Sequence, residues 1–331
     1  MKKRPVTLAS GQFGDMSLEE LCQMCRRIGY EGIELAAHAH FDVGKALEEP
    51  GYVPWVKETL EKYGLKCYAI SAHLTGQCVG DVWDPRLDHF APSEISGQPE
   101  KIRAWAIAEM KRTVKAASMM GVKVITGFTG SPIWAWWYSY PQTTREMIDD
   151  GYQLIYDLWT PIFDVFDEYG IQFAREVHPT EIAYDYYSTE ALLKKFNYRP
   201  TLGINFDPSH LVWQGVNELT FVRDFADRIY HVHAKDVKIN RNEKAGILGS
   251  HIEFGDTRRG WNFVSVGQGD VDFDGIIREL NQAGYEGPIS VEWEDSIGRR
   301  CGKAGDGRLP IFAIQILPRA NLLKKYLLNL V

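Results

Sequence analysis

Short apolar runs alternate with amphipathic stretches along most of the chain. Eight of these runs have the apolar, β-branched character of buried strands. They span residues 6–12, 32–37, 66–74, 122–128, 171–179, 201–208, 228–236 and 287–295. The stretches between them repeat apolar residues at helical spacing, and several end in glycine, a frequent residue at helix C-termini. Eight strand–helix repeats predict an α/β protein whose parallel units close into a (β/α)₈ TIM barrel.

Three of the predicted connections are much longer than the others. They span residues 75–98, 129–143 and 237–270 and follow the third, fourth and seventh strands. Extended loops after strands lie at the C-terminal mouth of a barrel, where active sites are built. We expect one TIM-barrel catalytic domain over residues 1–296. Residues 297–331 lose the alternation and are basic and apolar, which predicts a C-terminal extension that packs on the barrel or on a partner chain.

Composition narrows the class of protein. The chain has 331 residues, of which 45% are hydrophobic, and a formal net charge of −7. No apolar run approaches the ~18 residues that a membrane span needs. The apolar stretch after Met1 is too short for a signal peptide, so we expect a cytoplasmic protein. Its basic residues are scattered, and this argues against a nucleic-acid partner.

Each of the last four predicted strands ends in two polar residues spaced two positions apart. The pairs are Glu176 and His178, Asn205 and Asp207, His231 and His233, and Glu292 and Glu294. Residues at i and i+2 share one face of a strand. An outward-facing pair would meet an apolar helix, so these side chains should point into the barrel mouth.

Such a grouping of carboxylates favours a bound cation. Buried carboxylates are unfavourable together unless a positive charge neutralises them. Oxygen ligands with one imidazole nitrogen suit Mn²⁺, Mg²⁺, Co²⁺ or Zn²⁺. We expect Glu176, Asp207, His233 and Glu292 to bind one divalent metal, with His210 reaching toward whatever the metal binds.

Other polar and aromatic residues are weaker candidates. His73 ends the third predicted strand and either contacts substrate or makes a structural hydrogen bond, and Glu34 near the end of the second strand is similar. Arg258 lies in the long loop after strand 7, where it is either solvated or binds an anionic group. Trp134 opens an aromatic cluster that either packs internally or stacks on a substrate.

At these residues the sequence resembles the xylose-isomerase-like TIM-barrel superfamily, and more narrowly the sugar phosphate isomerase/epimerase family. The resemblance covers residues 6–296 and rests on "REVHP", "GINFDPSHL", "YHVHAKD" and "GYEGPISVEWED". It implies a metal, with Mn²⁺ expected first, on the four ligands named above, and substrate contacts from His210 and His231. It also implies a sugar isomerase or epimerase in which Glu176 and Glu292 exchange protons next to a carbonyl.

A branch of the family suggests a different outcome of the same chemistry. The segments "EVHP" and "VEWED" and the long loops resemble catalytic subunits of enzymes that cleave 3-oxo-C-glycosides. That resemblance implies a lyase in which His178 removes the C2 proton and the aglycone leaves by β-elimination. It also allows for a small second subunit, whereas the apolar C-terminal tail favours self-association into a homo-oligomer.

Two classes outside sugar isomerisation share the barrel. An endonuclease-IV-like phosphodiesterase needs about three zinc ions and a basic mouth, whereas this chain is acidic and offers ligands for one metal. A non-catalytic sugar-binding barrel would not need the complete ligand set. We therefore expect a small-molecule sugar or glycoside as the substrate.

Overall fold

The computed structural model describes residues 4–295 and confirms the predicted barrel. Its eight parallel strands are β1 (Val6–Ala9), β2 (Gly32–Ala36), β3 (Lys66–Ser71), β4 (Val124–Gly127), β5 (Gln172–Glu176), β6 (Leu202–Phe206), β7 (Ile229–Ala234) and β10 (Ile289–Val291). They close in the order β1-β10-β7-β6-β5-β4-β3-β2. The predicted extension at 297–331 lies outside the described residues.

Ten α-helices are described between residues 4 and 295. They are α1 (Leu18–Ile28), α2 (Val43–Glu48), α3 (Tyr52–Lys62), α4 (His73–Gly80), α5 (Pro99–Met120), α6 (Arg145–Tyr169), α7 (Tyr186–Lys195), α8 (Pro208–Gln214), α9 (Glu218–Asp224) and α10 (Phe273–Gln282). Short 3₁₀ helices occupy Gly11–Phe13, Leu87–Phe90, Ser93–Ile95, Trp134–Trp136, Ala226–Arg228 and Gly249–His251.

The strands end earlier than the apolar runs suggested. Strand β3 stops at Ser71, so His73 is the first residue of α4 and not, as predicted, the end of a strand. Strand β6 stops at Phe206, and Asp207 is the N-cap of α8. The runs continue past the strands because the first residues of the following turns are also buried.

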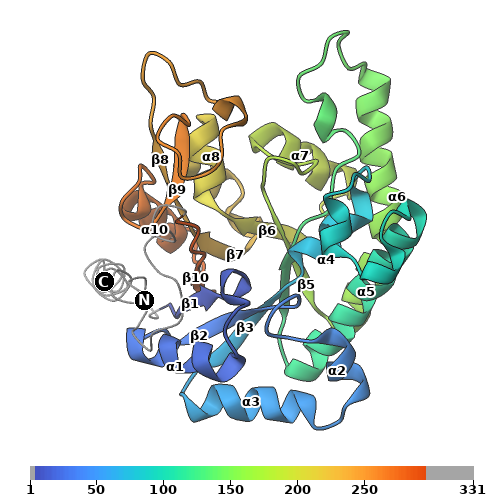
Figure 1. The fold of residues 1–331 in the computed structure, drawn as a ribbon, viewed down its shortest axis with the longest axis vertical. Coiled ribbons are helices and arrows are strands. Elements are labelled where there is room, and N and C mark those ends of the chain that lie inside the picture. The colour runs from blue at the N-terminus through green and yellow to red at the C-terminus, as the bar shows by residue number, and fades with distance from the viewer. Residues whose placement is uncertain (1–3, 296–331) are drawn as a thin grey trace. The chain divides into compact units, whose positions relative to one another are not determined.

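The long segment after the seventh barrel strand contains a hairpin where the sequence predicts an extended loop. Strands β8 (Asp236–Ile239) and β9 (Trp261–Val264) pair antiparallel. The indole of Trp261 stacks on that of Trp213 in α8, with ring centroids 4.4 Å apart and planes inclined by 8°. Figure 1 shows the hairpin beside α8. Burial of its apolar face explains why this segment is ordered as a hairpin.

The chain divides into two compact units that interleave along the sequence. The first comprises the described parts of Met1–Glu34, Thr59–Lys66 and Phe206–Val331. The second comprises Leu35–Glu58 and Cys67–Asn205.

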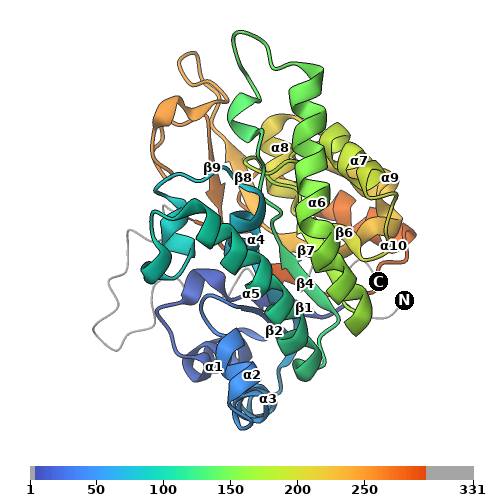
Figure 2. The ribbon, with the colours of Figure 1, turned by 90° about the vertical axis from the view of Figure 1, so that its right-hand side faces the viewer.

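The core of the second unit is aromatic. Trp159, Phe163 and Phe166 of α6 recur at helical spacing, and all three rings lie within 6 Å of the Phe173 ring on β5. Helices α5 and α6 lie side by side on this unit (Figure 2). This packing fixes β5 and the segment that follows it, which carries several candidate site residues.

No helix within residues 4–295 is long and apolar enough to cross a membrane.

Candidate metal centre and active site

The first unit places a buried glutamate between two histidines. Strand β7 carries His231 and His233 on one face, and the Nε2 atom of each lies 2.9 Å from Oε2 of Glu34 at the end of β2. All three side chains are at most 1% exposed. Burial disfavours the ionised carboxylate, but the two histidines outweigh it and hold the pKa of Glu34 well below its usual range. Glu34 therefore fixes the orientation of both imidazoles.

The second nitrogen of His233 faces a set of possible metal ligands. Its Nδ1 lies 3.1 Å from Oε2 of Glu292. A neutral imidazole that donates its Nε2 proton to Glu34 keeps a lone pair on Nδ1. Asp207, His233 and Glu292 each place a ligand atom within 4.8 Å of the others. These three donors are positioned for one ion.

The two carboxylate oxygens of Asp207 have different partners: one caps a helix and the other faces the candidate metal site. Its Oδ1 accepts hydrogen bonds from the backbone N–H (2.9 Å) and the hydroxyl (2.6 Å) of Ser209. Through these bonds Asp207 caps the N-terminus of helix α8. Its Oδ2 lies 3.5 Å from Nε2 of His210 and 3.0 Å from Nζ of Lys235. The cap holds the carboxylate rigidly, so Oδ2 is presented in one direction.

Lys235 is a buried cation at the same place. Its ammonium also lies 2.9 Å from Oε2 of Glu292 and 3.5 Å from Oε2 of Glu294, and its side chain is 3% exposed. The other oxygen of Glu292 accepts a hydrogen bond from Gln12 Nε2 at 3.0 Å. The positive charge of Lys235 offsets the negative charges of Asp207, Glu292 and Glu294. Carboxylates grouped in this way favour a cation between them.

The β8–β9 hairpin covers these residues with an aromatic ring. The Phe263 ring packs edge-on against the His210 imidazole, with centroids 5.4 Å apart, and lies 4.9 Å from Nζ of Lys235. Asp236 anchors the segment after the hairpin by accepting backbone hydrogen bonds from Gly267 and Gly269, both at 2.8 Å. An apolar cover excludes water and strengthens the electrostatic interactions beneath it.

The second unit contributes its own carboxylate–histidine pair. Oε2 of Glu176, the last residue of β5, lies 2.9 Å from Nε2 of His73 and accepts a hydrogen bond from Asn205 Nδ2, also at 2.9 Å. Ser71 bonds the other nitrogen of His73 at 2.7 Å. His73 thus contacts Glu176 directly, an arrangement that the sequence did not indicate.

His178 lies in the turn after β5. Its Nδ1 is 3.3 Å from the Thr180 hydroxyl, and its ring packs against Phe128 at 4.8 Å between centroids. Thr180 has φ 107°, a region that β-branched residues rarely adopt. The strained backbone turns the chain so that the next residue, Glu181, is fully buried.

Glu181 anchors the loop that follows β4. One of its oxygens, Oε2, accepts hydrogen bonds from the backbone N–H groups of Thr129 (2.7 Å) and Gly130 (2.8 Å). Asp81 accepts the next N–H, that of Ser131, at 2.6 Å. Burial raises the pKa of Glu181, and burial together with the charge of Glu181 raises the pKa of Asp81 to about 7. Two carboxylates thus bind three successive amides.

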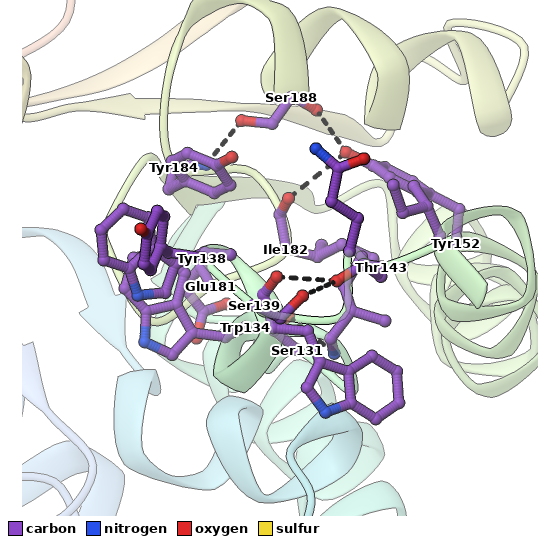
Figure 3. A pocket seen from close by; sticks show the side chains of 15 residues that line it. Ser131, Trp134, Tyr138, Ser139, Thr143, Tyr152, Glu181, Ile182, Tyr184 and Ser188 are labelled. Atoms are coloured by element: carbon purple, nitrogen blue, oxygen red, sulfur yellow. Dashed lines mark hydrogen bonds between the residues drawn. The ribbon is translucent and has the colours of Figure 1, made fainter. Parts of the chain in front are cut away.

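Trp134 and Arg258 are the remaining candidates. Trp134 begins a 3₁₀ helix and lines a pocket of about 470 Å³ in the second unit (Figure 3). Arg258 is 75% exposed in the first unit and pairs with Asp256 at 2.7 Å. Its contact with a substrate stays a prediction.

Comparison with known families decides the class of the chain. The family model described as xylose isomerase-like TIM barrel matches residues 22–308. The chain belongs to this family. The resemblance to the xylose-isomerase-like TIM-barrel superfamily is thereby confirmed.

Two relatives illustrate the range of the family match. The chain is 23% identical to a protein named YfiH from Bacillus subtilis (strain 168) over 315 residues, which cover 88% of this chain and 92% of YfiH. It is 37% identical to inosose dehydratase from Clostridium beijerinckii (strain ATCC 51743 / NCIMB 8052) over 89 residues. That match covers only 27% of this chain and 29% of the dehydratase.

Solved structures share the barrel of this family. The probable 3-DHS dehydratase AsbF from Bacillus anthracis aligns with TM-score 0.66 and 19% identity over 97% of this chain and 98% of its own. The IOLI protein with a bound zinc atom aligns with TM-score 0.65 and 17% identity over 97% and 99%. The 3-keto-D-glucoside 4-epimerase YcjR from E. coli aligns with TM-score 0.65 and 16% identity over 97% and 100%. At these identities the likeness shows the fold.

The sequence analysis did not predict which residues orient or neutralise the candidate metal ligands. Glu34 orients His233, and Lys235 neutralises Asp207 and Glu292. Each left a signal: Glu34 is the one charged residue within the apolar run 32–37, and Lys235 directly follows the "HVHA" strand. A charge within or directly after a buried strand needs a partner, and this requirement points to both residues.

Proposed function

We propose that the protein is a divalent-metal-dependent enzyme that removes a proton from the carbon next to a carbonyl of a sugar or related polyol. The observation that carries the proposal is His233, held by Glu34 at one nitrogen and turned toward Glu292 at the other. Metal-binding histidines are oriented by a carboxylate in this way. The names of the dehydratase and epimerase relatives support sugar chemistry.

The metal would be held by Asp207, His233, Glu292 and Glu176. Glu176 ends β5, and the strand order places β5, β6, β7 and β10 next to one another. Asp207 follows β6, His233 lies on β7 and Glu292 follows β10. The donor set suits Mn²⁺ first, with Mg²⁺, Co²⁺ or Zn²⁺ as alternatives. When bound, the ion supplies Lewis-acid polarisation of the substrate carbonyl.

The protein's own groups would move the proton. In an isomerase or epimerase, Glu176 and Glu292 take and return it on opposite faces of the substrate. His73 contacts Glu176 and, with His210, binds substrate hydroxyls. The apolar cover formed by Phe263 keeps water away from the reacting carbon.

Deuterium exchange tests this function. The Mn²⁺-loaded protein is incubated in D₂O with a panel of ketoses and 3-keto-glycosides, and deuterium at carbon is followed by NMR. We expect exchange next to the carbonyl of at least one substrate. Glu292→Gln should slow it by about 10²–10⁴-fold, whereas exchange by the exposed control Glu190→Gln should match wild type. No exchange with any member of the panel would refute the proposal.

A β-elimination lyase is the second candidate. Two of the relatives are named as dehydratases, which denotes loss of water from the substrate. In this reaction His178, oriented by Thr180 at Nδ1, would remove the C2 proton of a 3-oxo-glycoside, and the group on C1 would leave with the C–X electron pair. An unsaturated ketone with its ultraviolet absorbance would form, and His178→Ala would abolish it. Epimerisation without this absorbance would favour the first candidate.

A further inference from the structure

The second unit contains a pocket that several aromatic side chains line. Its lining comes from the 3₁₀ helix Trp134–Trp136 and the residues after it, from the first turns of α6, and from the segment 181–188 (Figure 3). The pocket measures about 470 Å³. That volume is in the range of sites that hold a small organic molecule.

The indoles offer flat surfaces to a ligand. Trp134 and Trp137 stack with centroids 6.1 Å apart and planes inclined by 19°, and Tyr184 meets Trp134 edge-on at 5.2 Å. Trp137 and Tyr138 are 51% and 80% exposed. Large aromatic side chains left exposed together around a pocket mark a binding surface more often than a structural one.

Most hydroxyl groups of the pocket are already engaged within the protein. Ser139 and Thr143 bond each other at 2.6 Å, and Thr143 donates to the carbonyl of Trp136 at 2.9 Å. Tyr152 donates to the carbonyls of Ile182 and Ser188, both at 3.3 Å. A sugar needs a partner for nearly every hydroxyl. This pocket therefore suits a ligand with a large apolar face and few polar groups.

Glu181 supplies a polar group that the protein leaves unmatched. Its Oε2 takes the bonds from Thr129 and Gly130, while Oε1 is buried without a hydrogen-bond partner among residues 4–295. The guanidinium of Arg175 lies 3.7 Å from Oε2. Leaving a buried carboxylate oxygen unpaired costs about 1–3 kcal/mol. A hydrogen-bond donor on a ligand would remove that cost.

We infer that this pocket binds a flat aromatic group that carries a hydroxyl donor, with the ring against Trp134 and Trp137 and the hydroxyl donated to Oε1 of Glu181. Such a group is either a free phenol or the aryl part of a larger glycoside. The segment 177–184 joins the pocket to Glu176, so an aryl glycoside held here would extend toward the end of β5. The site does not depend on a metal.

Calorimetric titration of the metal-free protein at pH 8 tests this inference apart from the proposed function. The probes are 2-naphthol, 2-methoxynaphthalene, which cannot donate, and glucose. We expect 2-naphthol to bind about tenfold more tightly than the methoxy compound, and glucose not to bind. In Glu181→Gln the amide N–H₂ replaces the free oxygen as the carbonyl takes over the backbone bonds. Because both naphthalenes can accept a hydrogen bond from this amide, the preference for 2-naphthol should disappear.

Tryptophan variants locate the binding. Trp137→Ala, which changes an exposed residue, and Trp134→Ala should each lower the affinity for 2-naphthol at least tenfold. Trp55 on α3 is also exposed, and Trp55→Ala should bind 2-naphthol like wild type. If 6-hydroxy-2-naphthyl β-D-glucoside binds more tightly than 2-naphthol, the natural ligand is the aryl part of a glycoside. If only 2-naphthol binds, the natural ligand is a free phenol. Either result supports the site. Absence of naphthol binding, or naphthol binding unchanged in both pocket tryptophan variants, would overturn it.

Discussion

Nε2 of His233 lies 2.9 Å from Oε2 of Glu34, and both side chains are buried. Because this bond fixes which ring nitrogen is left for a metal, Glu34→Gln should weaken divalent-metal binding by about 10–100-fold without removing any ligand. Competition titration against a chromogenic chelator measures the change. The exposed control Glu19→Gln should bind as wild type does. Equal affinity in Glu34→Gln would show that Glu34 does not position His233.

Lys235 should stabilise the protein most when no metal is present. Lys235→Met leaves Asp207 and Glu292 without their buried cation, and breaking such a pair costs about 3–5 kcal/mol, or roughly 10 °C in Tm for a protein of this size. Added Mn²⁺ should restore most of the loss, because it supplies the missing charge.

A matched control separates this effect from the loss of any lysine. Lys238 is 46% exposed and pairs with Asp270, so Lys238→Met should lower Tm little. Thermal unfolding of wild type and of both variants, each with and without Mn²⁺, gives the Tm values to compare. A Lys235→Met variant as stable as wild type without metal would contradict the charge balance described here.

Asp81 should make stability fall as pH rises toward neutrality. Burial and the nearby Glu181 raise its pKa from 3.8 to about 7 in the folded protein. Between these values the folded state binds the proton more tightly than the unfolded state, so the free energy of unfolding decreases with rising pH. Asp81→Asn removes this titration.

Urea unfolding between pH 4.5 and 7.5 measures the slope. The slope should be shallower in Asp81→Asn than in wild type, and the exposed Asp15→Asn should keep the wild-type slope. Part of the slope will remain in Asp81→Asn because the pKa of Glu181 is raised as well. Identical slopes in wild type and Asp81→Asn would show that Asp81 does not titrate in this range.

The barrel could be predicted because its signal is repetitive. Most residues of the barrel strands are buried, and each of the eight predicted runs contains one of the barrel strands. The two histidines of β7 could also be paired, since the period of two puts His231 and His233 on one face. The hairpin β8–β9 was missed because a long polar segment separates its two strands along the chain.

Contacts between distant segments could not be predicted in the same way. Glu34 and His233 are 199 residues apart in sequence, and neither local spacing nor composition relates them. The same holds for Glu181 and Thr129, whose contact depends on the turn at Thr180. Such pairs follow from the fold, and only the oddity of a charge within an apolar run indicates that a partner exists.

Metal content tests the central claim most directly. Elemental mass spectrometry of the purified, undialysed protein should find about one Mn, Co, Mg or Zn per chain, and Glu176→Gln should lose it while the exposed control Glu190→Gln retains it. This result would establish Glu176 as a ligand together with the donors of the first unit. Wild-type protein without metal even after reloading, or Glu176→Gln with the wild-type content, would contradict the account.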